Sequence, residues 1–154
     1  MDTVSEPAAQ LSIRRMETRD AAAVATLVEE LGYRRDAEEV MQWIADMLGR
    51  TETQTALVAC LGEQVIGWIE VSIEFRLQSP PYGLIGGLVV KDGYRNQEVG
   101  LRLCQRAEAW TWERGLTTLR VTSRSTRADA HRFYLKNGYS LTKTSQIFEK
   151  KRPE

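Results

Sequence analysis

The hydrophobic residues of this chain recur with two periods, and each period predicts one kind of element. Alternation at every second position predicts strands, and the short run Leu88-Val89-Val90 predicts a buried one. Spacings of three and four residues predict amphipathic helices, as at Val99, Leu103, Ala107 and Trp110. The predicted strands span residues 11–16, 56–61, 65–75, 84–91 and 119–123, and the predicted helices span 19–31, 37–48, 98–114 and 127–136.

Each predicted helix is bounded by residues that commonly cap or stop helices. Asp36, with Glu39 three residues later, matches a capping box. The other predicted N-caps are Thr18 and either Ser125 or Thr126, and the predicted stops are Gly32, Gly115 and Asn137-Gly138. The second helix is expected to bury one stripe, made of Val40, Trp43, Ile44, Met47 and Leu48.

The connections between the strands predict how the chain is organised. Gly62-Glu63 predicts a hairpin turn, and Ser79-Pro80-Pro81-Tyr82-Gly83 is expected to interrupt the chain as a stiff loop. Residues 139–149 alternate enough for one or two closing strands. The predicted order is therefore β-α-α-β-β-β-α-β-α-β(β), a mixed α/β chain whose N-terminal half is mostly antiparallel and whose second half contains a βαβ unit.

The junction between the strand at 84–91 and the following helix has the features of an anion site. Lys91-Asp92-Gly93 predicts a tight turn, and Arg95 stands just before the helix. The first turn of a helix offers unpaired N–H groups and a partial positive charge, which suit a pyrophosphate. Gly100 allows a ligand to approach the backbone closely, although a plain turn would show the same residues.

Two stretches together resemble the GNAT superfamily of acyl-CoA-dependent N-acyltransferases. Arg95-Asn96-Gln97-Glu98-Val99-Gly100 is similar to its pyrophosphate motif, Arg/Gln-x-x-Gly-x-Gly/Ala. Phe133-Tyr134 with Gly138-Tyr139 is similar to its C-terminal signature. The resemblance implies the GNAT fold, with a central, mostly antiparallel mixed sheet of six to seven strands and about four helices. It also implies acetyl-CoA as co-substrate and transfer of the acetyl group to an amine.

The resemblance also implies roles for individual residues. The pantetheine arm would pair with the backbone of Leu88, Val89 and Val90, and Tyr134 would be the general acid that protonates the leaving thiolate. Arg127 would add a guanidinium contact to CoA phosphate, since one subgroup of the family has arginine at this place. The pyrophosphate would be surrounded by Arg95, Asn96, Gln97, Glu98, Val99, Gly100 and Leu101.

Two departures from the family pattern bear on the chemistry. Glu98 stands where the motif usually has glycine, which indicates an altered loop whose carboxylate can point outward. Family members often carry a glutamate on the central strand as base, but residues 84–87 here are Leu-Ile-Gly-Gly. The base is therefore open: Glu70 or Glu74 could act through water, or the amine could arrive neutral. On their strand these glutamates form a polar face that is either solvated or the wall of a cleft.

The acceptor is open as well. Residues 64–150 look most like the aminoalkylphosphonate N-acetyltransferase subgroup, but the shared residues mainly serve cofactor and scaffold. A small primary amine or an aminoglycoside-like amine is expected, with Tyr33, Arg34, Arg35 and Trp43 as candidate substrate residues. The single histidine, His131, is expected to be structural. The alternatives are a non-catalytic acyl-CoA-binding regulatory domain and a protein or peptide N-acetyltransferase.

Composition narrows the remaining possibilities. The 154 residues suit one domain over 10–154, preceded by a flexible tail at 1–9. The 21 basic residues balance 21 acidic ones, so neither nucleic acid nor a membrane is an expected partner, whereas a homodimer is possible. Cys60 and Cys104 are expected to be reduced core thiols in a cytoplasmic protein, and no metal site is expected. No hydrophobic run of 18 residues occurs.

Overall fold

The computed structural model describes residues 10–95, 98–123 and 127–154, so the predicted tail at 1–9 and the predicted caps Ser125 and Thr126 lie outside the described residues. The chain forms two compact units, Met1–Val121 and Thr122–Glu154. The elements are β1 (Leu11–Arg15), the 3-10 helix η1 (Thr18–Asp20), α1 (Ala21–Glu29), α2 (Ala37–Leu48), β2 (Gln54–Leu61), β3 (Gln64–Arg76), β4 (Ser79–Val90), α3 (Val99–Glu113), β5 (Leu119–Val121) and α4 (Ala128–Lys136).

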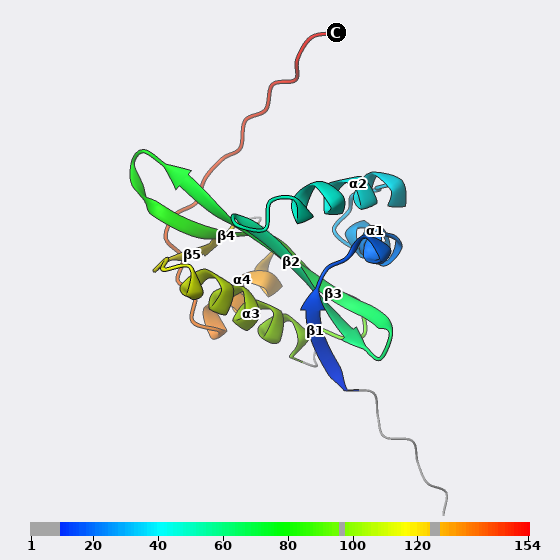
Figure 1. Ribbon diagram of the computed structural model, residues 1–154. Coiled ribbons are helices and arrows are strands. Elements are labelled where there is room, and N and C mark those ends of the chain that lie inside the picture. Colours follow the sequence, from blue (N-terminus) through cyan, green and yellow to red (C-terminus); the bar gives the residue numbers. More distant parts are fainter. Residues whose placement is uncertain (1–9, 96–97, 124–126) are drawn as a thin grey trace, which may run out of the picture. The chain divides into compact units, whose positions relative to one another are not determined.

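The first unit is built on a sheet whose strands lie in the order β1-β2-β3-β4-β5 (Figure 1). Strands β1 to β4 pair antiparallel, and β5 pairs parallel to β4 through the crossover helix α3. This confirms the predicted element order as far as the last helix, the four helices, and the βαβ unit in the second half of the chain. The sheet has five strands among the described residues, fewer than the six to seven expected.

Helices cover both faces of the sheet (Figure 1). On one face, Trp68 of β3 and Val89 of β4 pack in a hydrophobic cluster with residues of α1 and α2, such as Leu27 and Ile44. The glycine Gly67, next to Trp68, points to the other face. A Cβ atom there would lie 3.3 Å from side-chain carbons of Val99 and Leu103, so α3 packs almost against the β3 backbone.

Helix ends follow local rules in most places. The capping box of Asp36 and Glu39 forms at the start of α2, and Gly32 adopts φ +92° just after α1. The prediction that Thr18 caps the first helix is wrong. Thr18 instead begins the 3-10 helix η1, whose N-cap is Glu17, and Asp20 is the N-cap of α1. The Glu17 N–H donates to the Asp20 carboxylate, 2.8 Å away.

The predicted buried stripe of α2 is only partly correct. Val40 and Ile44 are buried, but Trp43 is 51% exposed and Leu48 is also exposed. Trp43 lies outside the core, and the guanidinium of Arg35 stands 5.9 Å from its ring centroid. The hydrophobic spacing therefore located the helix correctly but overstated the width of its buried face.

The predicted loop at residues 79–83 is a strand, which is a further correction. β4 begins at Ser79, and β3 and β4 form one long hairpin that includes Pro80 and Pro81. The pairing is irregular here, since Glu74 opposes Tyr82 and Arg76 opposes Ser79. An irregular strand start tolerates proline because its missing N–H is not needed for the ladder.

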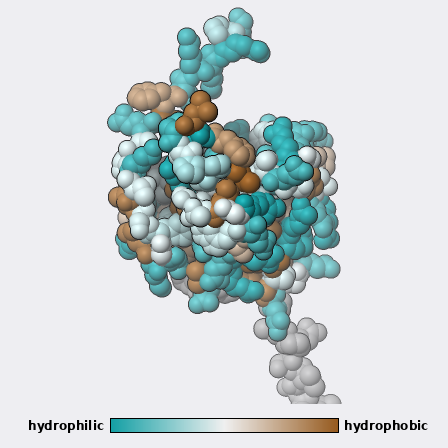
Figure 2. Space-filling view, turned by 60° about the vertical axis from the view of Figure 1, so that its left-hand side comes forward, coloured by the Kyte–Doolittle hydropathy of each residue, from teal (hydrophilic) through white to brown (hydrophobic). Residues whose placement is uncertain are grey.

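Figure 2 shows hydrophobic residues interspersed with hydrophilic ones on the face that it turns forward.

The second unit contains α4, stopped at Asn137 and Gly138 as predicted, and a segment without helix or strand from residue 139 to 154. The expected closing strands are therefore absent from these described residues. A strand needs a neighbour to satisfy its backbone groups, and this unit has no other strand among its described residues. The hydrophobic side chains of Leu141, Ile147 and Phe148 in this segment are 79 to 88% exposed.

An ion pair between the half-buried Arg14 and the buried Asp20 ties β1 to the start of α1. Arg14 donates to both carboxylate oxygens of Asp20 at 2.8 and 2.7 Å, and the Asp20 side chain is only 4% exposed. Burial acts to raise the pKa of Asp20, but the hydrogen bonds from Arg14 and from the Glu17 N–H outweigh it, so the pKa is lowered. Asp20 is thus an acid whose ionised form the fold stabilises.

We expect Asp20→Asn to lower the free energy of unfolding at pH 7 by about 2 kcal/mol, because two hydrogen bonds from the Arg14 guanidinium lose their charged acceptor. Since the folded pKa of Asp20 is lowered, this loss should shrink as the pH falls through that pKa. Urea unfolding at pH 7 and at acid pH measures both effects. Arg19→Gln, which breaks the exposed pair with Glu17, is the control and should cost less than about 0.5 kcal/mol. Equal stability of Asp20→Asn and wild type would contradict the assignment.

Candidate functional site

Strand β4 is paired on both sides over only part of its length. β3 pairs with it from Ser79 to Val90, whereas β5 pairs only with Gly83–Ile85. Among the described residues, no strand lies against the β5 side of β4 beyond Ile85. Backbone N–H and C=O groups on that edge need partners, and an extended ligand can supply them as an added strand would. Leu88, Val89 and Val90, the predicted pantetheine residues, all lie on this stretch.

A β-bulge marks the point where β5 leaves β4. Glu70 opposes Gly87 and Val71 opposes Ile85, so Gly86 has no opposite residue on β3. A bulge bends its strand, which accounts for the loss of pairing to β5 at this place. The sequence carried a signal for it, since two adjacent glycines inside a strand often mark a bulge or a close approach.

At the bulge, Glu70 and Trp68 of β3 occupy the space that side chains at Gly86 and Gly87 of β4 would fill, and this place is called the recess below. A Cβ atom at Gly86 would lie 2.9 Å from Oε1 of Glu70, and one at Gly87 would lie 2.7 Å from Cη2 of Trp68. The two glycines therefore leave room for a carboxylate and an indole from β3. Gly86 and Glu70 are open to solvent, yet the surrounding protein desolvates the carboxylate enough to raise its pKa.

The other end of the free edge leads to the start of α3. After the turn at Gly93, which has φ +91°, the helix begins with the buried residues Val99 and Gly100, followed by the half-buried Leu101. The first-turn N–H groups have no partner within the helix and can donate hydrogen bonds to an anion. Asn96 and Gln97, predicted to contact the same anion, lie outside the described residues.

Glu98 precedes α3 in a left-handed conformation, with φ 60° and ψ 14°. It is the one non-glycine residue with positive φ in the described part of the chain. The family motif has glycine at this place, and the backbone conformation explains why, since a side chain costs about 1 kcal/mol there. The Glu98 side chain is exposed, in keeping with the predicted outward orientation.

Arg95 is held in the first unit by acceptors of the protein itself. Its Nη2 donates to Glu30 Oε2 at 3.2 Å, its Nε donates to the Val90 carbonyl at 3.2 Å, and Nη1 lies 3.8 Å from Asp92 Oδ1. Glu30 also accepts from the backbone N–H of Asp92. Glu30, at the end of α1, thus ties down the loop before α3, and no motif in the sequence indicated this role.

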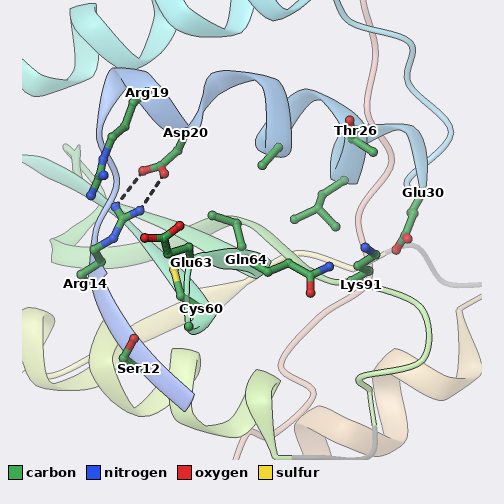
Figure 3. A pocket seen from close by; sticks show the side chains of 14 residues that line it. Ser12, Arg14, Arg19, Asp20, Thr26, Glu30, Cys60, Glu63, Gln64 and Lys91 are labelled. Atoms are coloured by element: carbon green, nitrogen blue, oxygen red, sulfur yellow. Dashed lines mark hydrogen bonds and ion pairs between the residues drawn. The ribbon is translucent and has the colours of Figure 1, made fainter. Parts of the chain in front are cut away.

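A separate hollow of about 740 Å³ opens beside α1 (Figure 3). Charged side chains line it, and two of its acids are already engaged: Asp20 pairs with Arg14, and Glu30 pairs with Arg95. None of the predicted acetyl-CoA residues lines this hollow. We therefore place the candidate site at the free edge of β4.

Arg127 and Tyr134 belong to the second unit. Arg127 is the exposed N-cap residue of α4, and Tyr134 is half-buried, with its ring 5.3 Å from Phe133 and 5.6 Å from Tyr139 between centroids. The Tyr139 N–H donates to the Tyr134 carbonyl, which closes the turn after the helix. Their predicted roles, a phosphate contact and the general acid, stay predictions.

The remaining observations concern the cysteines, metal-ligating groups and helix hydrophobicity. Cys60 and Cys104 are both buried, as predicted. Among the described residues, no group of three or more His, Cys, Asp or Glu side chains could hold a metal ion. None of the helices in the described ranges is long and hydrophobic enough to cross a membrane.

Comparison with known proteins identifies the class. The model of the acetyltransferase (GNAT) family matches residues 16–139. The chain is 31% identical over 129 residues to an aminoalkylphosphonate N-acetyltransferase of Salmonella typhimurium, covering 82% of this chain and 83% of that one. It is 27% identical over 141 residues to an aminoglycoside N(6')-acetyltransferase type 1 of Stenotrophomonas maltophilia, covering 89% and 91%. Among solved structures, aminoglycoside N-acetyltransferase AAC(6')-Iy in complex with CoA superposes with a TM-score of 0.81 at 15% identity, covering 96% and 99%.

The chain therefore belongs to the GNAT acetyltransferase family. It is an acetyl-CoA-dependent N-acetyltransferase, as the resemblance of its two motifs implied. Its fold is the α/β fold of that family, with four helices and a five-stranded mixed sheet in the described residues.

We expect Glu98→Gly to raise the free energy of unfolding by about 1 kcal/mol, because glycine adopts positive φ without strain. For a chain of this length that corresponds to a rise in Tm of about 2–4 °C. The same change removes a carboxylate beside the predicted pyrophosphate site, so acetyl-CoA should also bind several-fold more tightly. Calorimetric unfolding and titration measure the two effects.

Glu98→Ala separates the two causes, because it removes the charge but keeps a Cβ atom at the strained position. It should tighten acetyl-CoA binding like Glu98→Gly without the gain in Tm. Equal Tm values for the two variants would show that the backbone at residue 98 is not strained.

Proposed function

We propose that this enzyme transfers the acetyl group of acetyl-CoA to a primary amine of a small molecule by direct attack within a ternary complex. The observation that carries the proposal is the free edge of β4, which runs from the bulge at Gly86 to Val90 and is followed by the start of α3. One end of this path suits the pyrophosphate, and the other brings the thioester to the exposed residues Gly86 and Glu70.

In this proposal, the backbone of Leu88, Val89 and Val90 holds the pantetheine arm. The pyrophosphate is bound by the first-turn N–H groups of α3, at Val99, Gly100 and Leu101. Arg95 and Arg127 supply positive charge, and Arg95 would exchange part of its contact with Glu30 and Asp92 for phosphate oxygens. Asn96, Gln97 and Glu98 would surround the same pyrophosphate, with their backbone N–H groups as donors.

The acyl transfer itself follows from the chemistry of thioesters. The neutral amine attacks the carbonyl carbon, a C–N bond forms, and the C–S bond breaks with its electron pair passing to sulfur. Tyr134 donates a proton to the leaving thiolate. A phenol and a CoA thiol both have a pKa of roughly 10 or somewhat lower, so this transfer is close to balanced.

The acceptor class rests on the relatives and on the recess. Both relatives are named for small molecules that carry an amine, an aminoglycoside and an aminoalkylphosphonate. The recess at Gly86 and Glu70 is open to solvent and offers a carboxylate, which would attract an ammonium group. We therefore propose a small, cationic primary amine as acceptor.

The proposal is tested by incubating the purified protein with acetyl-CoA and a panel of amines and detecting products by mass spectrometry. The panel holds aminoglycosides, aminoalkylphosphonates, polyamines, amino acids and short peptides. We expect one class of small amine to be acetylated preferentially. Tight binding of acetyl-CoA with no product would favour a regulatory binding domain, and acetylated peptides alone would favour a peptide acetyltransferase.

We expect Tyr134→Phe to lower kcat by about 100-fold, because the leaving thiolate loses its proton donor. Binding of acetyl-CoA should change little, since the phenyl ring keeps the packing with Phe133 and Tyr139. Steady-state kinetics with the best amine of the panel and a binding titration measure the two quantities. Tyr139→Phe, in the same aromatic cluster, is the control and should stay within about threefold of wild type. An unchanged kcat in Tyr134→Phe would remove this residue from the mechanism.

A further inference from the structure

The central strand lacks a carboxylate, but the neighbouring strand places one against it. Residues 84–87 of β4 offer no ionisable side chain, and Glu70 of β3 projects to the bulge. Its Oε1 would be 2.9 Å from a Cβ atom at Gly86 and 3.4 Å from one at Gly87. The carboxylate thus occupies space that side chains of β4 would otherwise fill.

We propose that Glu70 is the catalytic carboxylate that removes the proton from the acceptor ammonium, and that Gly86 and Gly87 are required to seat it. The inference rests on the proposed function, because it assigns a residue of that same site. It makes β3, rather than β4, the strand that supplies the base in this enzyme.

The environment of Glu70 suits this task. Among the described residues its carboxylate has neither an ion-pair nor a hydrogen-bond partner, and desolvation alone raises its pKa. The residues opposite it, Ala56 on β2 and Gly87 on β4, are uncharged, and no charged group of the helices over this face contributes to the shift. An acid without a partner that stays open to solvent is poised to exchange a proton with a bound amine.

Glu74 lies on the same face of β3 but in a different state. Its Oε1 accepts from the Ser72 hydroxyl at 2.8 Å, and its Oε2 accepts from Arg76 at 3.0 Å. A carboxylate held by a hydroxyl and a guanidinium is less free to approach an amine, because both contacts would have to break first. Of the two glutamates that the sequence left open, the geometry therefore favours Glu70.

The recess has one more unpaired polar group. The indole Nε1 of Trp68 is buried without a hydrogen-bond partner in the described part of the chain, and the residue is 7% exposed. The far edge of the same indole lies over Gly87, beside the Glu70 carboxylate. Trp68 therefore walls the recess on one side and helps to desolvate the carboxylate.

The proton balance is complete without another reactant. The acceptor binds as an ammonium, and Glu70 takes one proton directly or through one water. The amine lone pair then forms the C–N bond, and the C–S bond breaks as the thiolate receives a proton from Tyr134. A second proton leaves nitrogen as the amide forms and replaces the one that Tyr134 gave. Glu70 releases its proton to solvent when product leaves.

The test compares Glu70→Gln with Glu74→Gln, using the best amine of the panel. We expect Glu70→Gln to lower kcat about 100-fold at pH 7 and to leave the Kd for acetyl-CoA unchanged. Glu74→Gln should stay within about threefold of wild type. Unfolding of Glu70→Gln should occur at the same or a higher denaturant concentration, because a desolvated charge has been removed.

The pH dependence separates a base from a structural residue. In the wild type, kcat/KM should fall as the pH drops through the raised pKa of Glu70, because only the ionised form accepts a proton. In Glu70→Gln this limb should disappear, and the rate should instead keep rising until the pH reaches the pKa of the amine itself. The ratio of wild-type to variant rates should therefore shrink at high pH.

Gly86→Ala tests the seat of the carboxylate. The added Cβ atom meets only the flexible end of Glu70, so the protein should fold, but the carboxylate must move and kcat should drop about tenfold. Full activity in Glu70→Gln, or a loss confined to Glu74→Gln, would overturn the inference while leaving the acetyltransferase activity intact. No product from the wild type with any amine would overturn the proposed function and this inference with it.

Discussion

The structure of the first unit depends on an imbalance in the hydrogen bonding of β4. One edge of this strand is satisfied by β3 along its whole length, and the other is satisfied by β5 over three residues only. Backbone groups left without a neighbour are stable only if water or a ligand completes them. The bulge at Gly86, the departure of β5 and the position of α3 all maintain this incomplete edge. The candidate site is thus the stretch of β4 that has a neighbouring strand on one side only.

Much of the fold could be predicted because its determinants are local. Asp36 and Glu39 satisfy each other's backbone groups within one turn of α2. Gly138 adopts a positive φ that few other residues tolerate. Both signals define a helix end without any contact to distant parts of the chain. The predictions of a loop at residues 79–83 and of strands at 139–149 were wrong, because the structure of these segments is not determined locally. Whether such a segment becomes a strand depends on a neighbouring strand that pairs with it, and the sequence of the segment does not show whether that neighbour exists.

The candidate site likewise combines features of consecutive residues, which could be predicted, with contacts between distant residues, which could not. The turn and the start of α3 were predicted from consecutive residues, and the anion-binding role of this segment stays a prediction. The contact of Glu30 with Arg95 joins positions 65 residues apart, and the seat of Glu70 depends on a register shift between two strands. Neither could be read from one sequence. Gly86 and Gly87 have no side chains, and the space left on β4 is occupied by side chains of the neighbouring strand β3.

The left-handed backbone at Glu98 has an implication for how this chain can change over time. Every codon for glutamate becomes a codon for glycine through one base substitution. The unstrained residue is therefore always within reach of a single mutational step, and the genetic code places no barrier in front of it. A lineage that keeps glutamate here keeps a residue that chance alone would readily replace, which makes this position informative when sequences of close relatives are compared.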